Sequence, residues 1–184
     1  GGSGYDIACA QSESPILYEK KKSGPLWSST SFDPHFKNNI YFLYLGNKQD
    51  SREGINLYQS KPPVSRKQLS YVSKLTEEFY QACNLENFQE IIRKHEKFVA
   101  DHLSLRPIKE QRFSDFWGEI KSLGAWGGDF ALVTSERSEV ELREYFFSYG
   151  LETLIPFDQM IYANNVSQAS QDNQLMPKQN DLIQ

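Results

Sequence analysis

Ile40-Tyr41-Phe42-Leu43-Tyr44-Leu45 is a continuous apolar and aromatic run that ends at Gly46. Its length is typical of a strand, and the absence of alternating polar residues indicates a strand that is covered on both faces. It is the clearest strand signal in the sequence, and we predict a buried strand here.

Weaker strand signals lie on both sides of this run. Upstream, two short segments surround the turn Ser23-Gly24-Pro25 and predict an antiparallel hairpin, and Asp33-Pro34 breaks the pattern that follows. Downstream, strand signals return near the end of the chain, where Pro156 interrupts them. The predicted strands span 16–19, 26–32, 130–134, 153–155 and 160–162.

Helical periodicity dominates the middle of the chain after the break at Pro62-Pro63. Apolar residues recur there at the spacing of three amphipathic helices, the third of which stops at Gly124. Ser138 and Glu141 have the spacing of a capping box, which predicts a fourth helix with Gly150 as its stop. The predicted helices span 69–82, 85–103, 114–123 and 139–149.

The order of these elements predicts the fold class. Strands at both ends with helices between them indicate an α+β layer, in which helices cover one face of a mainly antiparallel sheet. From Asn164 onward the sequence consists largely of Asn, Gln and Ser, so residues 164–184 are expected to form a disordered polar tail.

Composition limits the classes of function. The formal net charge is −4, and the 20 basic residues are scattered along the 184-residue chain, which argues against a nucleic-acid partner. Cys9 and Cys83 match neither a disulfide framework nor a metal-ligand spacing. The lack of a disulfide pattern leads us to expect a reducing, cytoplasmic setting. No segment reaches the length of a membrane span, so we expect no membrane partner. The sequence starts at Gly1 without methionine, which leads us to expect a fragment.

The segment Gly2-Ser3-Gly4-Tyr5-Asp6-Ile7-Ala8 is the first candidate for chemistry. Glycines on both sides of Ser3 allow the backbone to approach a ligand closely. The carboxylate of Asp6 could orient or deprotonate a hydroxyl nucleophile. The alternative is a glycine turn in which Asp6 caps the next helix, and spacing alone favours this alternative.

The second candidate is Lys121-Ser122-Leu123-Gly124-Ala125-Trp126-Gly127-Gly128-Asp129, which we interpret as a connection from a helix to a strand. Its three glycines exceed what a helix stop requires. Such a connection can present backbone N–H groups to an anion, or it can be a tight crossing packed against a neighbour.

Together the two segments resemble motifs of the GHMP kinases, the superfamily of galactokinase, homoserine kinase, mevalonate kinase and phosphomevalonate kinase. The first is similar to the family's Gly-Ser-Gly-x-Asp-x-Ala segment, which implies that Asp6 is the catalytic base or hydroxyl-orienting group, with Ser3 and Gly4 beside the substrate. The second is similar to the Lys-x-Ser-Gly-Ala-Gly-Gly-Gly-Asp motif of phosphomevalonate kinases, which implies a lining for the substrate and phosphate cleft. The residues that match it are Lys121, Gly124, Ala125, Gly127, Gly128 and Asp129, whereas Leu123 and Trp126 depart from the pattern.

The resemblance implies a fold and an activity. Residues 1–38 would be the distal remnant of the family's N-terminal domain, and residues 39–163 a ferredoxin-like C-terminal domain. The activity would be transfer of the ATP γ-phosphate, with Mg²⁺, to a hydroxyl or phosphate of a small metabolite, as in mevalonate and phosphomevalonate kinases. No segment here resembles the family's ATP-phosphate loop, so this chain alone is expected to be inactive. Apolar surface left near the hairpin would then favour a homodimer.

Arg52 and a pair of histidines are further candidates for a ligand site. Arg52 lies in the expected loop after the best strand and could meet a phosphate or carboxylate, or be a solvated charge. His95 and His102 share a helix face, but no third ligand is evident, so we predict structural roles and no metal site.

Two rival interpretations remain open. In one, the chain is a non-catalytic α+β module that binds a metabolite or a protein, and its glycines are structural. In the other, it is a ferredoxin-like regulatory domain unrelated to kinases.

Overall fold

The computed structural model describes residues 4–21, 23–46, 51–124, 126 and 128–161. The chain divides into two compact units, and the division falls between Phe32 and Asp33. The first unit contains the N-terminal residues, and the second is Asp33–Met160. The predicted polar tail, residues 164–184, lies outside the described residues.

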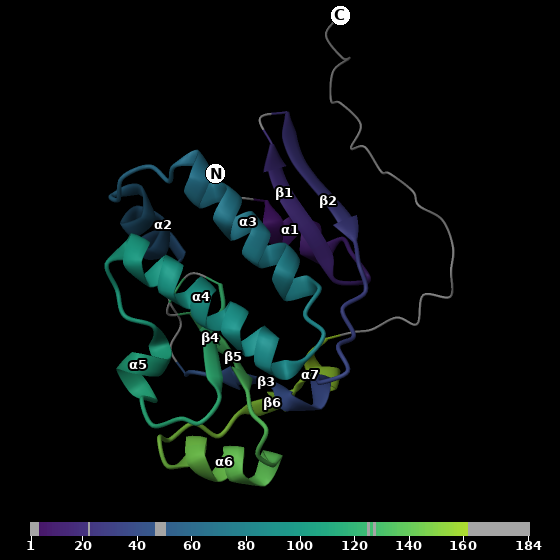
Figure 1. Cartoon of the computed structure of the whole chain (residues 1–184), viewed down its shortest axis with the longest axis vertical. Helices are drawn as coiled ribbons and strands as arrows, with labels where there is room; N and C mark the ends of the chain where they lie inside the picture. Colours follow the sequence, from purple (N-terminus) through teal and green to yellow (C-terminus); the bar gives the residue numbers. More distant parts are fainter. Residues whose placement is uncertain (1–3, 22, 47–50, 125, 127, 162–184) are drawn as a thin grey trace, which may run out of the picture. The chain divides into compact units, whose positions relative to one another are not determined.

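The N-terminal unit is a short helix with a β-hairpin (Figure 1). Helix α1 (Tyr5–Ala10) precedes the antiparallel strands β1 (Ile16–Lys21) and β2 (Gly24–Ser29), which pair along their whole length. Gly24 has a φ of 122°, a backbone conformation that residues with a side chain rarely adopt, so glycine suits the turn. The predicted hairpin is confirmed.

The second unit is built on a four-stranded antiparallel sheet with the order β4-β5-β3-β6. The elements follow the order strand, helices, strand, strand, helix, strand. The sheet strands are β3 (Ile40–Tyr44), β4 (Glu119–Ser122), β5 (Phe130–Thr134) and β6 (Leu154–Pro156).

The helices of this unit lie almost entirely between its strands. Ser138 and Glu141 form the predicted capping box. Ser65 and Gln68 form a second capping box, which was not predicted, at the start of the helix Arg66–Tyr80. Gly150, with φ 73°, follows the helix that Ser138 opens. The helices are η1 (Lys37–Asn39), α2 (Ser51–Gln59), α3 (Arg66–Tyr80), α4 (Leu85–Leu103), α5 (Ile108–Arg112), α6 (Glu139–Phe147) and α7 (Phe157–Met160).

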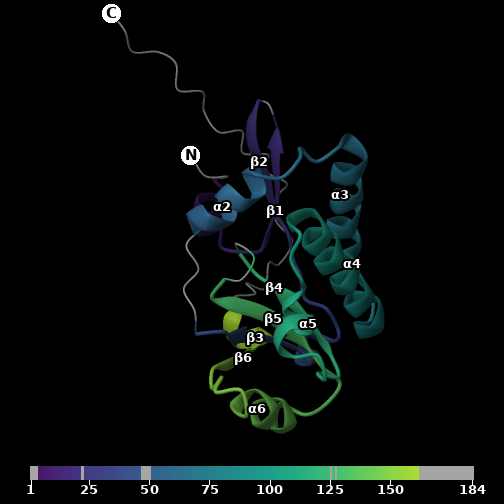
Figure 2. The ribbon, with the colours of Figure 1, turned by 90° about the vertical axis from the view of Figure 1, so that its left-hand side faces the viewer.

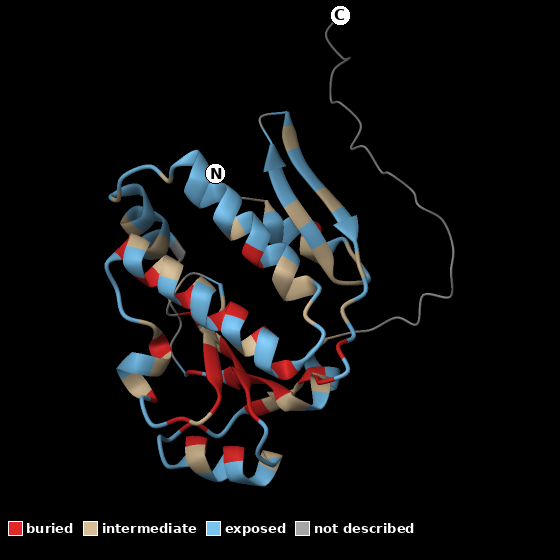
Figure 3. Cartoon of the chain, viewed as in Figure 1, coloured by how far each residue is buried: buried red, intermediate tan, exposed pale blue. Residues whose placement is uncertain are grey.

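The sheet is covered on both faces, which corrects the prediction of helices on one face only. Leu43, Ala131 and Val133 point to one face and share a buried cluster with Leu142 and Phe146 of α6. The opposite face meets α4, whose side chains bond to Glu119, Lys121 and Thr134. Figure 3 shows the buried residues concentrated in this sheet. The unbroken apolar run of β3 is the sequence feature that requires two covered faces.

The predicted helix over 114–123 is wrong. The chain instead makes the short helix α5, a turn, and the strand β4, which pairs with β5. Phe113, Phe116 and Ile120 do share one buried cluster, as the helical spacing suggested, but they reach it from a turn and a strand. Met160, predicted as strand, belongs to α7.

Within the described residues no helix is long and apolar enough to cross a membrane.

Gly118 is the position where packing demands glycine most strictly. A Cβ atom there would overlap the backbone carbonyl of Thr134, because the turn before β4 runs directly against β5. Gly150→Ala meets open space and carries only the cost of its positive φ. We predict that Gly118→Ala lowers the free energy of unfolding by about 3 kcal/mol or more and Gly150→Ala by about 1–2 kcal/mol, measured by urea titration. Equal losses would contradict this packing.

Candidate functional site

Asp6 lies at the start of α1. Gly4 has φ 80° and occupies the N-cap position, from which its carbonyl accepts a bond from the Ala8 N–H at 3.1 Å. Asp6 is therefore the second residue of the helix and not its cap, which corrects the interpretation favoured by spacing. Its side chain is exposed in the first turn, where a carboxylate interacts favourably with the helix dipole.

The tyrosine beside Asp6 packs α1 against the hairpin. The rings of Tyr5 and Tyr18 meet edge to face with centroids 5.7 Å apart. A hydrogen bond to Cys9, with partial burial, raises the pKa of Tyr5 to about 12. The start of α1 is thus held by its own neighbours, and Asp6 faces solvent from a fixed turn.

The glycine-rich segment is a connection between two strands, and not between a helix and a strand as predicted. It joins β4 to β5, and the Leu123 N–H closes it by donating to the Phe130 carbonyl at 3.1 Å. Gly124 has φ 68°, so the turn begins with a left-handed residue. The Leu45 N–H donates to the Asp129 carbonyl at 2.8 Å, which ties the turn to the end of β3.

Two polar atoms in this turn are buried without a hydrogen-bond partner in the part of the chain that the structure describes. They are the Trp126 indole Nε1 and the Asp129 carboxylate Oδ1. Leaving such a group unpaired costs about 1–3 kcal/mol, so buried polar atoms are usually satisfied by protein, water or a ligand. One atom donates and the other accepts, and both lie in the segment that the sequence singled out.

Lys121 points away from the turn, toward α4. Its ammonium lies 3.7 Å from the Glu96 carboxylate and donates to the Ser122 carbonyl at 3.2 Å. Burial lowers the pKa of Lys121 and raises the pKa of Glu96, while each charge partly offsets the shift of the other. Lys121 is thereby engaged in a buried ion pair.

The other predicted site residues are distributed as follows. Lys121, Gly124 and Gly128 belong to one hairpin. Arg52 is an exposed residue of α2, and not of a loop, while Gly4 and Asp6 belong to the N-terminal unit. Ser3, Ala125 and Gly127 lie outside the described residues.

Glu96 has a structural role that was not predicted from the sequence. It falls on the buried stripe of α4, one helical turn after Ile92 and one before Ala100, and only 3% of it is exposed. A carboxylate on the apolar stripe of a helix can be recognised in a sequence. Because an unpaired buried charge is costly, such a carboxylate predicts a cationic partner.

His95 and His102 are not brought together with a third ligand. Among the described residues no group of His, Cys, Asp and Glu side chains could hold a metal ion. His95 is half-buried next to Lys121, whereas His102 packs against the ring of Tyr58.

Comparison of the sequence with known protein families and with curated proteins finds no match.

The buried surroundings of His95 make stability depend on pH. Desolvation, aided by the charge of Lys121, lowers its pKa from 6.5 to about 4. As the pH falls below about 6.5, His95 becomes protonated in the unfolded chain but stays neutral in the folded chain until about pH 4. The free energy of unfolding therefore falls as the pH is lowered from about 6.5 to 4. Between pH 7 and pH 5 the wild type loses stability. We predict that this loss is smaller in His95→Gln by about 1–2 kcal/mol, a figure that allows for the partial exposure of the side chain.

The measurement is urea unfolding of both proteins at the two pH values. His35→Gln, at an exposed histidine, is the matched control and should keep the full pH dependence. If His95→Gln loses as much stability as the wild type between these pH values, the imidazole is not desolvated as described.

Proposed function

We propose that this chain is the acceptor-side part of a GHMP-type small-molecule kinase, which transfers the γ-phosphate of ATP to a hydroxyl or phosphate of a small metabolite. The observation that carries the proposal is the β4–β5 turn. It is rich in glycine, begins in the left-handed region at Gly124, and holds buried polar atoms of Trp126 and Asp129 that have no hydrogen-bond partner among the described residues. These features suit a turn that receives a polar ligand.

Phosphoryl transfer in such kinases requires no covalent intermediate with the protein. Phosphoryl transfer depends on positioning the reactants and on neutralising the charge around the transferred group. In the proposal, the backbone N–H groups of Gly124 and Gly128 face the substrate or its phosphate, because glycine lets a ligand approach the backbone closely. Asp6 orients the acceptor hydroxyl or removes its proton.

ATP is a substrate in this proposal, and Mg²⁺ arrives with it. Magnesium is usually bound by phosphate oxygens, water and one or two carboxylates, so a dedicated protein cage is not required. The Asp129 carboxylate, whose Oδ1 has no hydrogen-bond partner among the described residues, could be one such carboxylate ligand. No segment of the sequence resembles the family's phosphate loop, so we propose that this chain by itself does not turn over ATP.

The domain assignment is part of the same proposal. Residues 1–38 would be the remnant of the family's N-terminal domain, and residues 39–163 its C-terminal domain. Support comes from the hairpin at the beginning of the chain and from the ferredoxin-like connectivity of the second unit. Exposed apolar residues of α1 and the hairpin, Ile7, Leu17 and Leu26, support a homodimer through this surface.

A non-catalytic binding module is the second candidate, and Trp126 favours it. A bulky indole stands in the turn where a phosphate-binding backbone would be bare, and its Nε1 can donate to a bound metabolite. This candidate predicts binding of a metabolite without consumption of ATP.

The decisive variant is Asp6→Asn, which keeps the size of the side chain and removes its basicity. In the protein expressed from its complete coding sequence, we predict that ATP consumption with mevalonate, phosphomevalonate or sugar acceptors falls by a factor of about 10² or more. Glu13→Gln, an exposed carboxylate of the same unit, should leave turnover unchanged. Full turnover in Asp6→Asn would refute the role of Asp6, and no turnover with any acceptor would favour the binding module.

A further inference from the structure

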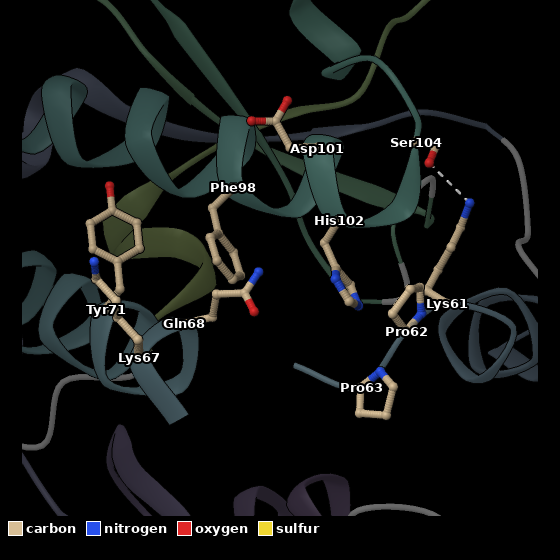
Figure 4. Close-up of a pocket in the computed structure, with 10 residues that line it drawn as sticks. All are labelled: Lys61, Pro62, Pro63, Lys67, Gln68, Tyr71, Phe98, Asp101, His102 and Ser104. Carbon is tan, nitrogen blue, oxygen red and sulfur yellow. Dashed lines mark hydrogen bonds between the residues drawn. The ribbon is translucent and has the colours of Figure 1, made fainter. Parts of the chain in front are cut away.

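Figure 2 shows the helices α3 and α4 lying side by side. A groove lies between the first turns of α3 and the last turns of α4, beside the Pro62-Pro63 segment (Figure 4). Its volume is about 630 Å³. Small-molecule sites commonly measure about 300–1,000 Å³. The groove lies within the second unit and shares no residue with the β4–β5 turn.

Side-chain rings make up much of the wall of the groove, and those of Tyr71, Phe98 and His102 are planar. Figure 4 shows the side chains of Phe98 and His102 projecting into it from α4. Tyr71 packs against Phe98 with ring centroids 5.8 Å apart, and the rings of Pro62 and Pro63 line the opposite end. Such walls favour a ligand with a planar ring, because aromatic faces stack well in offset or tilted arrangements.

Positive charge enters the groove from two sides. Lys61 and Lys67 lie at opposite ends of it (Figure 4). Lys61 donates to the Ser104 hydroxyl at 3.1 Å, and within the described residues no carboxylate pairs with either lysine. The one acidic side chain of the lining, Asp101, is paired with Lys97 at 3.2 Å. The groove therefore favours an anion.

Two neutral groups add donors between the lysines. In the capping box, the Gln68 Oε1 accepts from the Ser65 N–H at 2.9 Å and from the Ser65 hydroxyl at 2.8 Å, which leaves the amide N–H groups of Gln68 for another partner. The His102 Nε2 is buried and has no hydrogen-bond partner in the described part of the chain. A ligand oxygen beside it would satisfy that nitrogen.

We propose that this groove binds a phosphate monoester whose organic part is a planar aromatic ring. A phosphate monoester carries a charge of roughly −1.5 to −2 at neutral pH and three strong acceptor oxygens. It matches two ammonium groups, an amide and an imidazole better than a carboxylate does. The aromatic part lies against Phe98 and Tyr71, so recognition requires both halves of the ligand.

The chain has three histidines, which makes the imidazole NMR signals a direct probe of the groove. Phenyl phosphate is titrated into the full chain, with phenol and inorganic phosphate as the two separated halves, and His102→Gln assigns the signal. We expect phenyl phosphate to shift the His102 signal and leave those of His35 and His95 in place. It should bind about tenfold more tightly than inorganic phosphate, because stacking adds to the charge.

Variants of the two lysines separate a built site from a general charge effect. Lys61→Gln and Lys67→Gln should each weaken binding of phenyl phosphate by about three- to tenfold. Lys74→Gln is the matched control: it lies on α3 outside the groove, is paired with Glu78, and should bind as the wild type does.

Three results would overturn the proposal. They are an unmoved His102 signal, inorganic phosphate binding as tightly as phenyl phosphate, and equal weakening by Lys74→Gln and Lys67→Gln. Thermal unfolding of each variant checks that the fold is kept. The experiment has no catalytic readout, so its outcome is independent of the proposed kinase function.

Discussion

The burial of β3 on both faces is the constraint on which the second unit depends. β3 pairs with β5 on one side and with β6 on the other, so both edges of its backbone are hydrogen-bonded. Its side chains are buried on both faces of the sheet. Both ends of β3 are also fixed. At its start, Asn39 and Ser135 exchange hydrogen bonds of 2.8 and 3.0 Å, and at its end Leu45 holds the β4–β5 turn through Asp129. The candidate turn is therefore placed by the central strand.

The same arrangement explains why charged side chains point into the layer below α4. β4 is an edge strand, and inward-pointing charges discourage edge strands from pairing with other chains. Glu119 accepts from Arg93 at 2.9 Å and from Lys109 at 3.1 Å, and Lys121 pairs with Glu96 two positions further along. Buried ion pairs of this kind add little net stability but are costly to break, so they fix the position of α4 on the strand.

Local patterns predicted most elements, and failures came where tertiary contacts overrode them. The hairpin, β3, β5, the long helices and the capping box of Ser138 and Glu141 follow from periodicity and turn chemistry. Residues 114–123 failed because their apolar spacing fits both a helix and a turn followed by a strand, and pairing with β5 decides between the two. The glycine-rich candidate segment could be recognised in the sequence, but the directions of its side chains could not. No local pattern indicates that Lys121 turns toward Glu96.

The placement of Lys121 changes what the kinase proposal requires. Phosphoryl transfer needs positive charge close to the transferred group, and Lys121 is the only cationic residue in the glycine-rich motif. Because its ammonium is paired with Glu96 beneath α4, it neutralises a buried carboxylate of the fold. Under the kinase proposal, the positive charge near the transferred group would therefore have to come from a group other than Lys121. A lysine that matches a motif in sequence can thus have a structural role, here as the partner of a buried carboxylate. Its position places no restriction on the glycines that follow it in the turn.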